Sequence, residues 1–407
     1  MNFLYNENSK NKIKATKANG KYIYIENKKL LDLSYASGSL LLGHTSAIYK
    51  KSLNTLKSVG SNYSLINTYV EKFSVILKKI FPEYSKFIMC ATGTESNMKA
   101  LRIARAITNK KKIVMVSGSW HGSVDELLYT SNDKKCKKTK NLSSGLFNNK
   151  NTIVIPYNDF YNSKKILDNY KKQIAILIIE PIQQSLPFQS SEDYVKLIYN
   201  YCKKNNILIC FDEMITGMRL KEYSTYKKIK LSPDILTFGK IFGGGVPIGI
   251  IGIKKNIERQ LNKKNNYVFF GGTYSLNPFS SYLGINTINY ILKNKKKIYS
   301  KLDVLSERLS TQLNKFIDIN NLDLKIFRYS SILRIVYTNK NIKNKLEKEF
   351  AEKNKIKKIN KFKKYVYDNG IFLSKNGAIF LSYQNSKKDI AYVLKIFKSG
   401  FIKFLSS

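Results

Sequence analysis

The stretch LTFGKIFGGGVPIGIIG, residues 236–252, holds a single lysine, Lys240, between an apolar run and three consecutive glycines. Elsewhere lysines come in runs, such as the NKKK blocks at 109–112 and 294–297. An apolar neighbourhood disfavours the charged form of an amine, so its pKa falls and the amine becomes nucleophilic. The alternative is a surface lysine whose ammonium reaches water. In a chain so rich in lysine, Lys240 taken alone favours that alternative.

Further apolar runs lie on both sides of this stretch and are separated by segments with helical periodicity. They are KFIMCATG from 86, KKIVMVSG from 111, TIVIPYND from 152, IAILIIEPI from 174, ILICFDEM from 207, DILTFGK from 234 and IGIIGI from 248. Runs that are apolar throughout indicate strands buried on both faces. The pattern therefore predicts an α/β fold with a mostly parallel central sheet covered by helices.

The ends of the chain predict a second, smaller unit. A hairpin is expected near 22–35, and strands, a helix and a hairpin follow residue 321 before an amphipathic helix closes the chain. With 407 residues, the chain is too long for one compact core. We predict a large domain over 51–290 and a small α+β domain built from 1–50 and 291–407. The polar residues 131–150 are either a lid or a surface loop.

The charge balance is strongly basic, with 71 Lys and Arg against 28 Asp and Glu, a net charge of +43. Such a balance is typical of proteins that bind nucleic acid or another anionic surface. Here the basic residues are spread along the whole chain, and no nucleic-acid motif accompanies them. Lys, Asn, Ile and Tyr are abundant together, as AT-rich coding produces. A nucleic-acid partner is therefore not expected.

Metal, disulfide and membrane sites are not expected either. The four cysteines form no Cys-x-x-Cys pair, and the two histidines are far apart in sequence. They are Cys90, Cys136, Cys202, Cys210, His44 and His121. The start of the chain lacks the apolar core of a signal peptide, and no apolar run is long enough to span a membrane. We expect a cytoplasmic, reduced protein.

The segment CATGTESNMKALRIARA, residues 90–106, joins a predicted strand to a predicted helix. Small residues at Gly93 and Thr94 let backbone N–H groups approach an anion, and the N-terminus of a helix favours negative charge. A phosphate fits this turn. An ordinary threonine cap of the helix explains the same residues equally well.

Asp212 follows the apolar run ILICF, so its carboxylate is expected at the buried end of a strand. A buried carboxylate requires a partner, and a protonated ring nitrogen is one candidate. A helix cap or an ion pair with Arg219 is the alternative. In chain order, the phosphate turn, this aspartate and the isolated Lys240 match the phosphate, ring nitrogen and aldehyde of pyridoxal 5′-phosphate (PLP).

These motifs resemble those of class III (fold type I) PLP-dependent aminotransferases, especially the glutamate-1-semialdehyde 2,1-aminomutase branch. The similar stretches are TGTESNMKALRIARA, GSWHG, IIEPI, FDEMITGMRL, PDILTFGKIFGGGVPIGIIG and GGTYSLNP. Their order holds from about residue 20 to 405, which is nearly the whole chain. The resemblance implies the fold of this family, with a large PLP-binding domain and a small domain.

The resemblance also implies roles for individual residues. Lys240 is expected to hold PLP as a Schiff base, and Asp212 to pair with the pyridine nitrogen. Met214 is expected on one face of the ring. Trp120 stands where the family usually has Tyr or Phe on the other face, and an indole also stacks well.

Gly93 and Thr94 match the family's phosphate cup. Thr273 matches a threonine that reaches the phosphate from the neighbouring subunit, which implies a homodimer with shared active sites. His121 is expected to be structural rather than catalytic.

The substrate is less defined by these motifs. In the aminomutase branch, an arginine near the N-terminus binds the substrate carboxylate, and the segment NENSKNKIKATKANG has none. Lys14 or Lys17 could replace it only as a point charge, without the bidentate fork. We therefore expect an aminotransferase that acts on a small or sugar-derived carbonyl compound. An aminomutase is the alternative, and a non-catalytic PLP-fold or basic nucleic-acid-binding protein is disfavoured because Lys240, Asp212 and Thr94 are all present.

Overall fold

The computed structural model describes residues 14–60, 62–63, 65–131, 133, 136, 139–146, 150–188, 190–263, 266–374 and 377–406. Most of the N-terminal segment without arginine, and part of the polar segment 131–150, lie outside the described residues. At the start of that polar segment, β6 (Tyr129–Ser131) pairs antiparallel with β7 (Thr139–Asn141).

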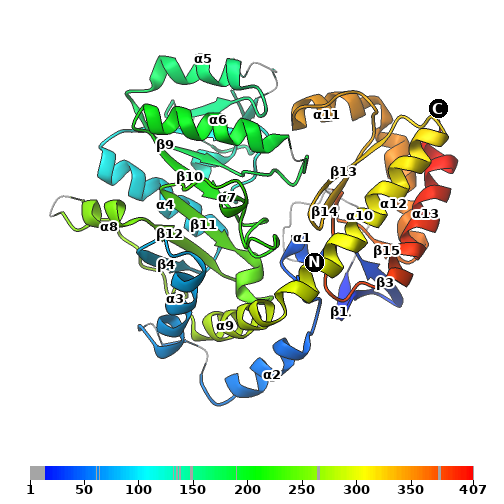
Figure 1. Cartoon of the computed structure of the whole chain (residues 1–407), viewed down its shortest axis with the longest axis horizontal. Coiled ribbons are helices and arrows are strands. Elements are labelled where there is room, and N and C mark those ends of the chain that lie inside the picture. The colour runs from blue at the N-terminus through cyan, green and yellow to red at the C-terminus, as the bar shows by residue number, and fades with distance from the viewer. Residues whose placement is uncertain are drawn as a thin grey trace.

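A seven-stranded sheet forms the centre of the large unit, in the order β4-β12-β11-β10-β9-β5-β8 (Figure 1). Its strands are β4 (Lys86–Cys90), β5 (Lys112–Val116), β8 (Thr152–Ile155), β9 (Ile174–Ile179), β10 (Leu208–Asp212), β11 (Ile235–Gly239) and β12 (Gly249–Ile253). Only β12 runs antiparallel to its neighbours in this sheet. The prediction of a mostly parallel sheet is confirmed. Because β10 and β11 are parallel neighbours, Asp212 and Lys240 both lie at their carboxyl ends.

Alternate residues of the central strands enter two different cores. In β9, Leu177 and Ile179 join a large cluster with residues of α6 (Ser191–Lys204), whereas Ile176 and Ile178 join a second cluster with α4 (Gly93–Thr108). All six side chains of β9 are buried. Burial on both faces explains why these strands read as continuous apolar runs.

The smaller unit lies beside the large one and joins both ends of the chain (Figure 1). One sheet has the order β1-β2-β3-β15, so N-terminal strands pair with a C-terminal one, and a second has the order β13-β14-β16. The strands are β1 (Ala15–Asn19), β2 (Tyr22–Ile25), β3 (Lys28–Asp32), β13 (Lys325–Tyr329), β14 (Ile332–Val336), β15 (Ile371–Phe372) and β16 (Ala378–Phe380). The predicted α+β unit is confirmed; its boundaries at residues 50 and 290 stay predictions.

The remaining helices cover these sheets. They are α1 (Tyr35–Gly38), α2 (Ala47–Leu56), α3 (Thr68–Ile80), α5 (Phe160–Tyr170), α7 (Thr225–Lys228), α8 (Lys255–Leu261), α9 (Pro278–Lys293), α10 (Lys295–Ile319), α11 (Lys345–Glu352), α12 (Ile356–Asp368) and α13 (Lys387–Leu405), with short 3-10 turns η1 (Asp125–Leu127), η2 (Lys240–Gly243) and η3 (Lys353–Lys355). The long α10 contacts α13 and β13 of the small unit, so the segment after α9 carries the chain from one unit to the other.

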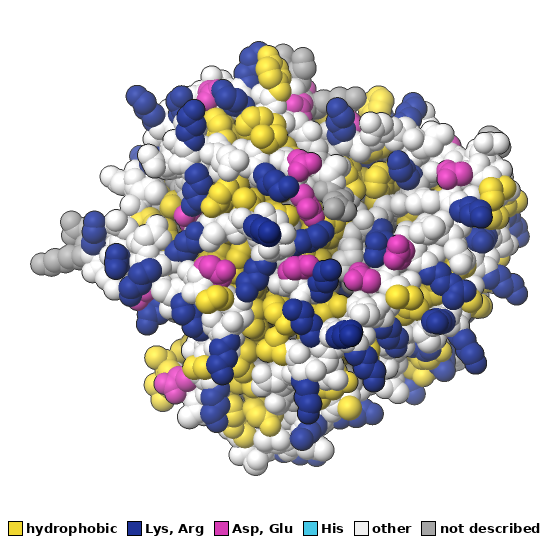
Figure 2. Space-filling model, in the orientation of Figure 1, with side chains coloured by type: hydrophobic (Ala, Val, Ile, Leu, Met, Phe, Trp, Pro, Cys, Tyr) yellow, Lys and Arg dark blue, Asp and Glu magenta, His cyan; other side chains and the backbone are white. Residues whose placement is uncertain are grey.

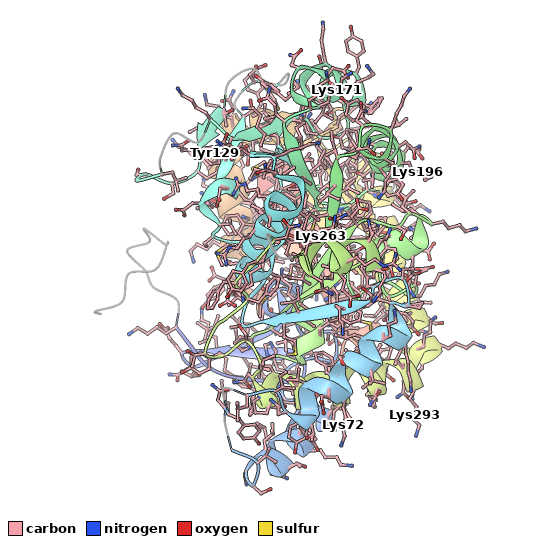
Figure 3. All side chains as sticks on the ribbon, turned by 90° about the vertical axis from the view of Figure 1, so that its left-hand side faces the viewer. Lys72, Tyr129, Lys171, Lys196, Lys263 and Lys293 are labelled. Atoms are coloured by element: carbon pink, nitrogen blue, oxygen red, sulfur yellow. The ribbon has the colours of Figure 1, made fainter. Side chains whose placement is uncertain are left out.

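The basic residues are distributed over the surface. Figure 2 shows Lys and Arg side chains across the visible face, with acidic side chains between them. Figure 3 shows lysines of different elements, such as Lys72, Lys196 and Lys293, extending outward in different directions. Among the described residues, no group of three or more His, Cys, Asp or Glu could hold a metal ion. No helix in that part of the chain is both long and apolar enough to cross a membrane.

Candidate active site

Asp212 ends β10 with its carboxylate almost fully buried, and three groups of the chain donate to or contact it. Asn97 Nδ2 lies 2.8 Å and His121 Nδ1 2.7 Å from Oδ2, and the backbone N–H of Met214 lies 3.0 Å from Oδ1. Thr237 Oγ1 in turn donates to Asn97 Oδ1 at 2.7 Å. The alternative partner, Arg219, does not form this ion pair. This network fixes the orientation of the carboxylate before any ligand arrives.

Met214 passes between two glycines whose missing side chains make room for it. A Cβ at Gly93 would lie 2.9 Å from Met214 Sδ, and a Cβ at Gly239 would lie 3.0 Å from the same atom. The thioether therefore lies between the N-terminus of α4 and the strand that leads to Lys240. The thioether is an apolar group where the resemblance expects one face of the ring, so these residues fit PLP.

The first turn of α4 forms an anion-binding N-terminus beside that surface. Thr92 caps the helix through Oγ1, which accepts from Glu95 N at 3.2 Å. Thr94 Oγ1 accepts from Ser123 N at 3.1 Å, and a Cβ at Gly122 would lie 2.4 Å from that same oxygen. The first backbone N–H groups of a helix have no partner within the helix, so those of Gly93 and Thr94 are suited to a phosphate.

Trp120 lies on the loop after β5 and is 52% exposed, which leaves its indole free to cover a ligand. Its backbone N–H donates to Glu180 Oε1 at 2.7 Å. Gln183 also binds this loop, because its Nε2 donates to Ser117 O at 3.1 Å and to Ser119 Oγ at 2.9 Å. Glu180 and Gln183 therefore hold the loop that carries Trp120 and His121.

Lys240 follows β11 directly and adopts a φ of 48°, in the left-handed region that a lysine rarely enters. Such conformations cost on the order of 1–3 kcal/mol and are concentrated at functional sites. Gly244 and Gly245 also have positive φ, at 63° and 114°, so these glycines let the backbone turn tightly behind the lysine. Burial lowers the pKa of Lys240, and the nearby carboxylates of Asp212 and Glu180 oppose part of this effect.

A strained turn borders the site on the side of the small unit. Tyr35, Ala36, Ser37 and Gly38 have successive φ values of 44°, 50°, 57° and 83°. Arg219, which is fully buried, holds this turn by donating to Gly38 O, and it also donates to Ser331 Oγ and Leu381 O. Burial lowers the pKa of Arg219 to about 10. Its guanidinium thus joins the two units instead of pairing with an acid.

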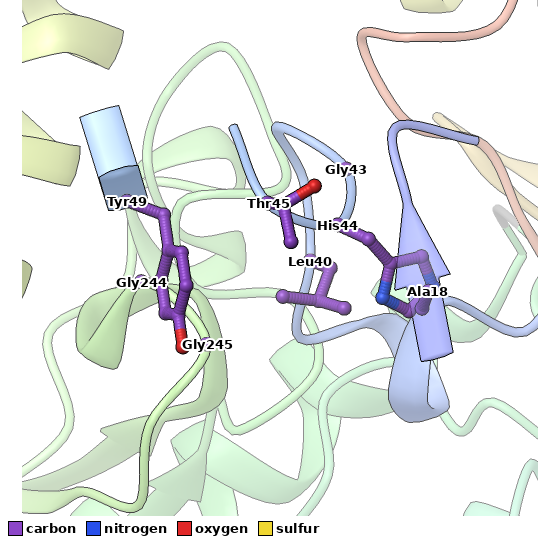
Figure 4. Close-up of a pocket in the computed structure, with 8 residues that line it drawn as sticks. All are labelled: Ala18, Leu40, Gly43, His44, Thr45, Tyr49, Gly244 and Gly245. Atoms are coloured by element: carbon purple, nitrogen blue, oxygen red, sulfur yellow. The ribbon is translucent and has the colours of Figure 1, made fainter. Parts of the chain in front are cut away.

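A pocket of about 180 Å³ adjoins the loop after Lys240 (Figure 4). Tyr49, Gly244 and Gly245 line one side, and Leu40 and His44 lie across from them. Asp212, Trp120 and Lys240 are not among its lining residues, so it is a neighbour of the proposed reaction site.

Comparison with known proteins agrees with this geometry. A family model described as "Aminotransferase class-III" matches residues 4–378. The chain belongs to the class-III aminotransferase family.

Curated members of this family that resemble the chain include two glutamate-1-semialdehyde 2,1-aminomutases. That of Wigglesworthia glossinidia brevipalpis is 32% identical over 396 residues, covering 94% of this chain and 90% of the relative. That of Thermosipho melanesiensis is 30% identical over 377 residues, covering 91% and 88%. Both relatives therefore align with nearly the full length of this chain.

Solved structures share the class-III fold. An omega-transaminase from Sphaerobacter thermophilus superposes with a TM-score of 0.88 at 17% identity, covering 95% of this chain and 90% of that one. A glutamate-1-semialdehyde-aminomutase variant from Pseudomonas aeruginosa PAO1, in complex with PMP, has a TM-score of 0.86 at 16% identity, with 97% and 88% covered. At these identities the likeness supports the fold.

Six of the seven predicted site residues of this class-III chain lie together. Contacts link Gly93 to Met214, Met214 to Asp212, and Trp120 to Glu180, whose charge acts on Lys240; Thr94 lies one residue beyond Gly93. Thr273 lies instead on an exposed loop, where its carbonyl accepts from Asn62 Nδ2 at 2.8 Å. Its expected role requires a second subunit and stays a prediction.

Three further residues belong to the site. The sequence patterns predicted no role for Asn97 or Glu180, and only a structural role for His121. Asn97 and His121 are the partners of Asp212, and Glu180 is a buried carboxyl beside Lys240. Asn97 comes four residues after Gly93, and residues at this spacing lie on the same face of a helix. This spacing is the signal that could have identified Asn97. The carboxyl of Glu180 directly follows the apolar run of β9, which is the same signal that identified Asp212.

Glu180 gives the protein a pH dependence that can be measured. Burial raises the pKa of Glu180 from 4.5 to about 7; the charge of His121 opposes the shift and that of Asp212 adds to it. The folded chain therefore keeps this proton up to about pH 7, whereas the unfolded chain releases it near 4.5. The contribution of protonated Glu180 to the free energy of unfolding is fully present below pH 4.5. It falls by about 3 kcal/mol as pH rises through 7.

We expect Glu180→Gln to remove this loss, because the amide keeps the acceptor for Trp120 N but does not ionise. Urea unfolding without PLP at pH 5 and pH 8 measures the difference. The free energy of unfolding of the variant relative to the wild type should rise by about 2.5 kcal/mol between these pH values. Parallel pH profiles for the two proteins would show that Glu180 is ionised throughout.

Proposed function

We propose that the chain is a PLP-dependent enzyme that transfers an amino group from an amino donor to a small or sugar-derived carbonyl compound. As a class-III aminotransferase, it uses PLP, which serves as an electron sink for the carbanion formed at the donor carbon. The observation that carries the proposal is the meeting of Lys240, Asp212 and the N-terminus of α4 at one end of the central sheet.

Each of these groups has one task in the proposed reaction. Asp212 keeps the ring nitrogen protonated, and Asn97 and His121 hold its carboxylate in place. The backbone N–H groups of Gly93 and Thr94 bind the phosphate, and Met214 and Trp120 hold the ring from its two faces. These positions orient the donor toward the end of β11.

Lys240 supplies the base and acid. Its Nζ would hold the cofactor at rest. Once freed by the donor, the amine would accept the proton from the donor's α-carbon and return it on the far side of the amino nitrogen, a 1,3-proton shift. A pKa lowered by burial increases the neutral fraction of this amine, and a base must be neutral.

The engagement of Arg219 within the chain favours a separate donor and acceptor over the intramolecular alternative. Arg219, whose charge acts on Lys240, already donates to Gly38 O, Ser331 Oγ and Leu381 O. It offers no bidentate fork to a substrate carboxylate. The alternative, a glutamate-1-semialdehyde-type aminomutase, is favoured by the names of the curated relatives.

We also propose a homodimer with shared sites. The segments around 62–67 and 267–276 are joined by hydrogen bonds from Asn62 and Asn67, and both carry exposed apolar side chains. These are Leu65, Ile66, Tyr267, Phe269 and Tyr274, each more than half exposed. Exposed apolar side chains on two joined segments are typical of an interface. A second copy would cover them and bring Thr273 to the partner's phosphate; a cytoplasmic location remains a further prediction.

Single-turnover reaction with amino donors distinguishes the two activities. We expect PLP-loaded protein mixed with Glu, Gln or Ala, without acceptor, to release the matching keto acid, because the amino group stays on the cofactor. Absorbance should shift from that of the aldehyde form to that of the amine form. Mass spectrometry that finds one substrate rearranged, with no keto acid released from any donor, would establish the aminomutase instead.

A further inference from the structure

The loop that carries Thr273 connects α8 to α9 and contains no helix or strand among its described residues, 262–263 and 266–277. Beside Thr273 its backbone closes a turn, from Ser275 N to Gly272 O at 2.9 Å. Thr273 is exposed, as are the aromatic side chains on both sides of it. The position of Thr273 must therefore depend on groups outside the loop.

Lys99, on α4, is one of these groups and is 2% exposed. Its Nζ donates to Phe270 O at 2.9 Å and to Ser275 Oγ at 3.4 Å, so it binds the loop on both sides of Thr273. The third neighbour of the ammonium is Glu95 Oε2 at 3.6 Å. The ammonium of Lys99 thus makes two hydrogen bonds to the loop and one ion pair within its own helix.

The burial of Lys99 carries a cost that its helix does not require. Removing an ammonium from water costs several kcal/mol, and an apolar side chain of similar length could fill the same space against the core. What an apolar side chain could not do is hold two separate points of the loop at fixed distances from α4. The charge of Lys99 is therefore explained by the loop.

Other donors reach the same loop from its outer side. Arg102 Nη1 donates to Phe269 O at 2.9 Å, and Asn62 Nδ2 donates to Thr273 O at 2.8 Å. Both contacts are exposed to solvent, where a hydrogen bond contributes less than in a buried site. Lys99 is the buried member of this set, so it is the strongest determinant of the loop's position.

We propose that Lys99 is a positioning residue for the cofactor of the neighbouring subunit. This proposal rests on the proposed function, in which Thr273 reaches the phosphate of the PLP bound by the neighbouring subunit. In this arrangement α4 serves two sites: its N-terminus, at Gly93 and Thr94, binds the phosphate of its own subunit, and Lys99 fixes the loop that completes the other.

Heterodimers of differently tagged chains test whether Lys99 acts in trans. In the first heterodimer, one chain carries Lys99→Met and Lys240→Ala and the other is unchanged. The site that keeps Lys240 then receives Thr273 from the altered loop, and we expect its Kd for PLP to rise about tenfold. In the second, the Lys99→Met chain keeps Lys240 and its partner carries only Lys240→Ala. The Kd for PLP of the site on the Lys99→Met chain should stay within about twofold of the Kd of an unaltered site.

Reduction with borohydride and quantification of cofactor on the tagged chain reads out each Kd. Thr273→Val in place of Lys99→Met should give the same trans-only pattern and guards against misfolding of the lysine variant. Lys78→Met is the matched control, because Lys78 Nζ also donates to loop carbonyls, Pro82 O and Tyr84 O, but in the connection between α3 and β4. It should leave both Kd values unchanged.

The outcomes separate this inference from the proposed function. Weaker binding in the second heterodimer, or equal binding in both, overturns the role of Lys99 in trans. Failure of the unaltered protein to bind PLP at all would overturn the proposed function and this inference with it.

Discussion

Replacing Lys240 with alanine is expected to lower turnover by at least about 10³-fold while leaving a folded protein that still binds PLP. The side chain is the only base that the proposed mechanism uses at the donor carbon. Asp212, Met214 and the N-terminus of α4 are untouched by the change, so the phosphate and ring contacts remain. The variant should therefore hold PLP noncovalently, and borohydride should not fix the cofactor to the chain.

Lys254→Met is the matched control for this result. Burial lowers the pKa of Lys254 as it does that of Lys240, but Lys254 Nζ donates to Ser232 O at 2.6 Å and lies beyond the other end of the sheet. Its loss should leave turnover and the covalent link unchanged. Turnover by Lys240→Ala equal to that of the wild type would rule out the proposed mechanism.

Replacing Asp212 with asparagine is expected to lower turnover by about 10²–10³-fold and to weaken PLP binding. The carboxylate supplies the negative charge that keeps the ring nitrogen protonated, and a neutral amide does not. The amide NH₂ would also face the donors of Asn97 and His121, which now face a carboxylate oxygen. Steady-state kinetics and titration with PLP measure the two effects.

Asp234→Asn separates a local effect on the cofactor from a general effect on the sheet. Asp234 is also buried and accepts from Ile209 N at 3.0 Å and from Lys203 Nζ, at the opposite end of the same strands. We expect this variant to lose thermal stability but to keep its Kd for PLP. If Asp212→Asn changes only stability in the same way, the carboxylate has no special role at the ring.

The strands and the order of the site residues could be predicted because they depend on local patterns. The run before Asp212 is apolar since β10 is buried on both faces, and Lys240 is isolated since η2 follows a buried strand. The neighbours of these residues could not be predicted in the same way. Asn97 and Asp212 are 115 positions apart, and only the packing of α4 on the sheet brings them together.

Backbone strain was also beyond the sequence patterns. The left-handed conformation of Lys240 and of three non-glycine residues in the turn Tyr35–Gly38 opposes local preference. Tertiary contacts impose it, such as the bond from Arg219 to Gly38 O. The sequence made Arg219 a possible partner for Asp212 because it lies only seven residues further along the chain. The structure shows that the arginine turns toward the small unit.

Covalent trapping tests the central claim most directly, because the chain offers many lysines and the account requires one. The purified protein is saturated with PLP, reduced with borohydride, digested, and the modified lysine is located by mass spectrometry. The account predicts that the cofactor's mass is found on Lys240. Modification of another lysine in its place, or no modification, would contradict it.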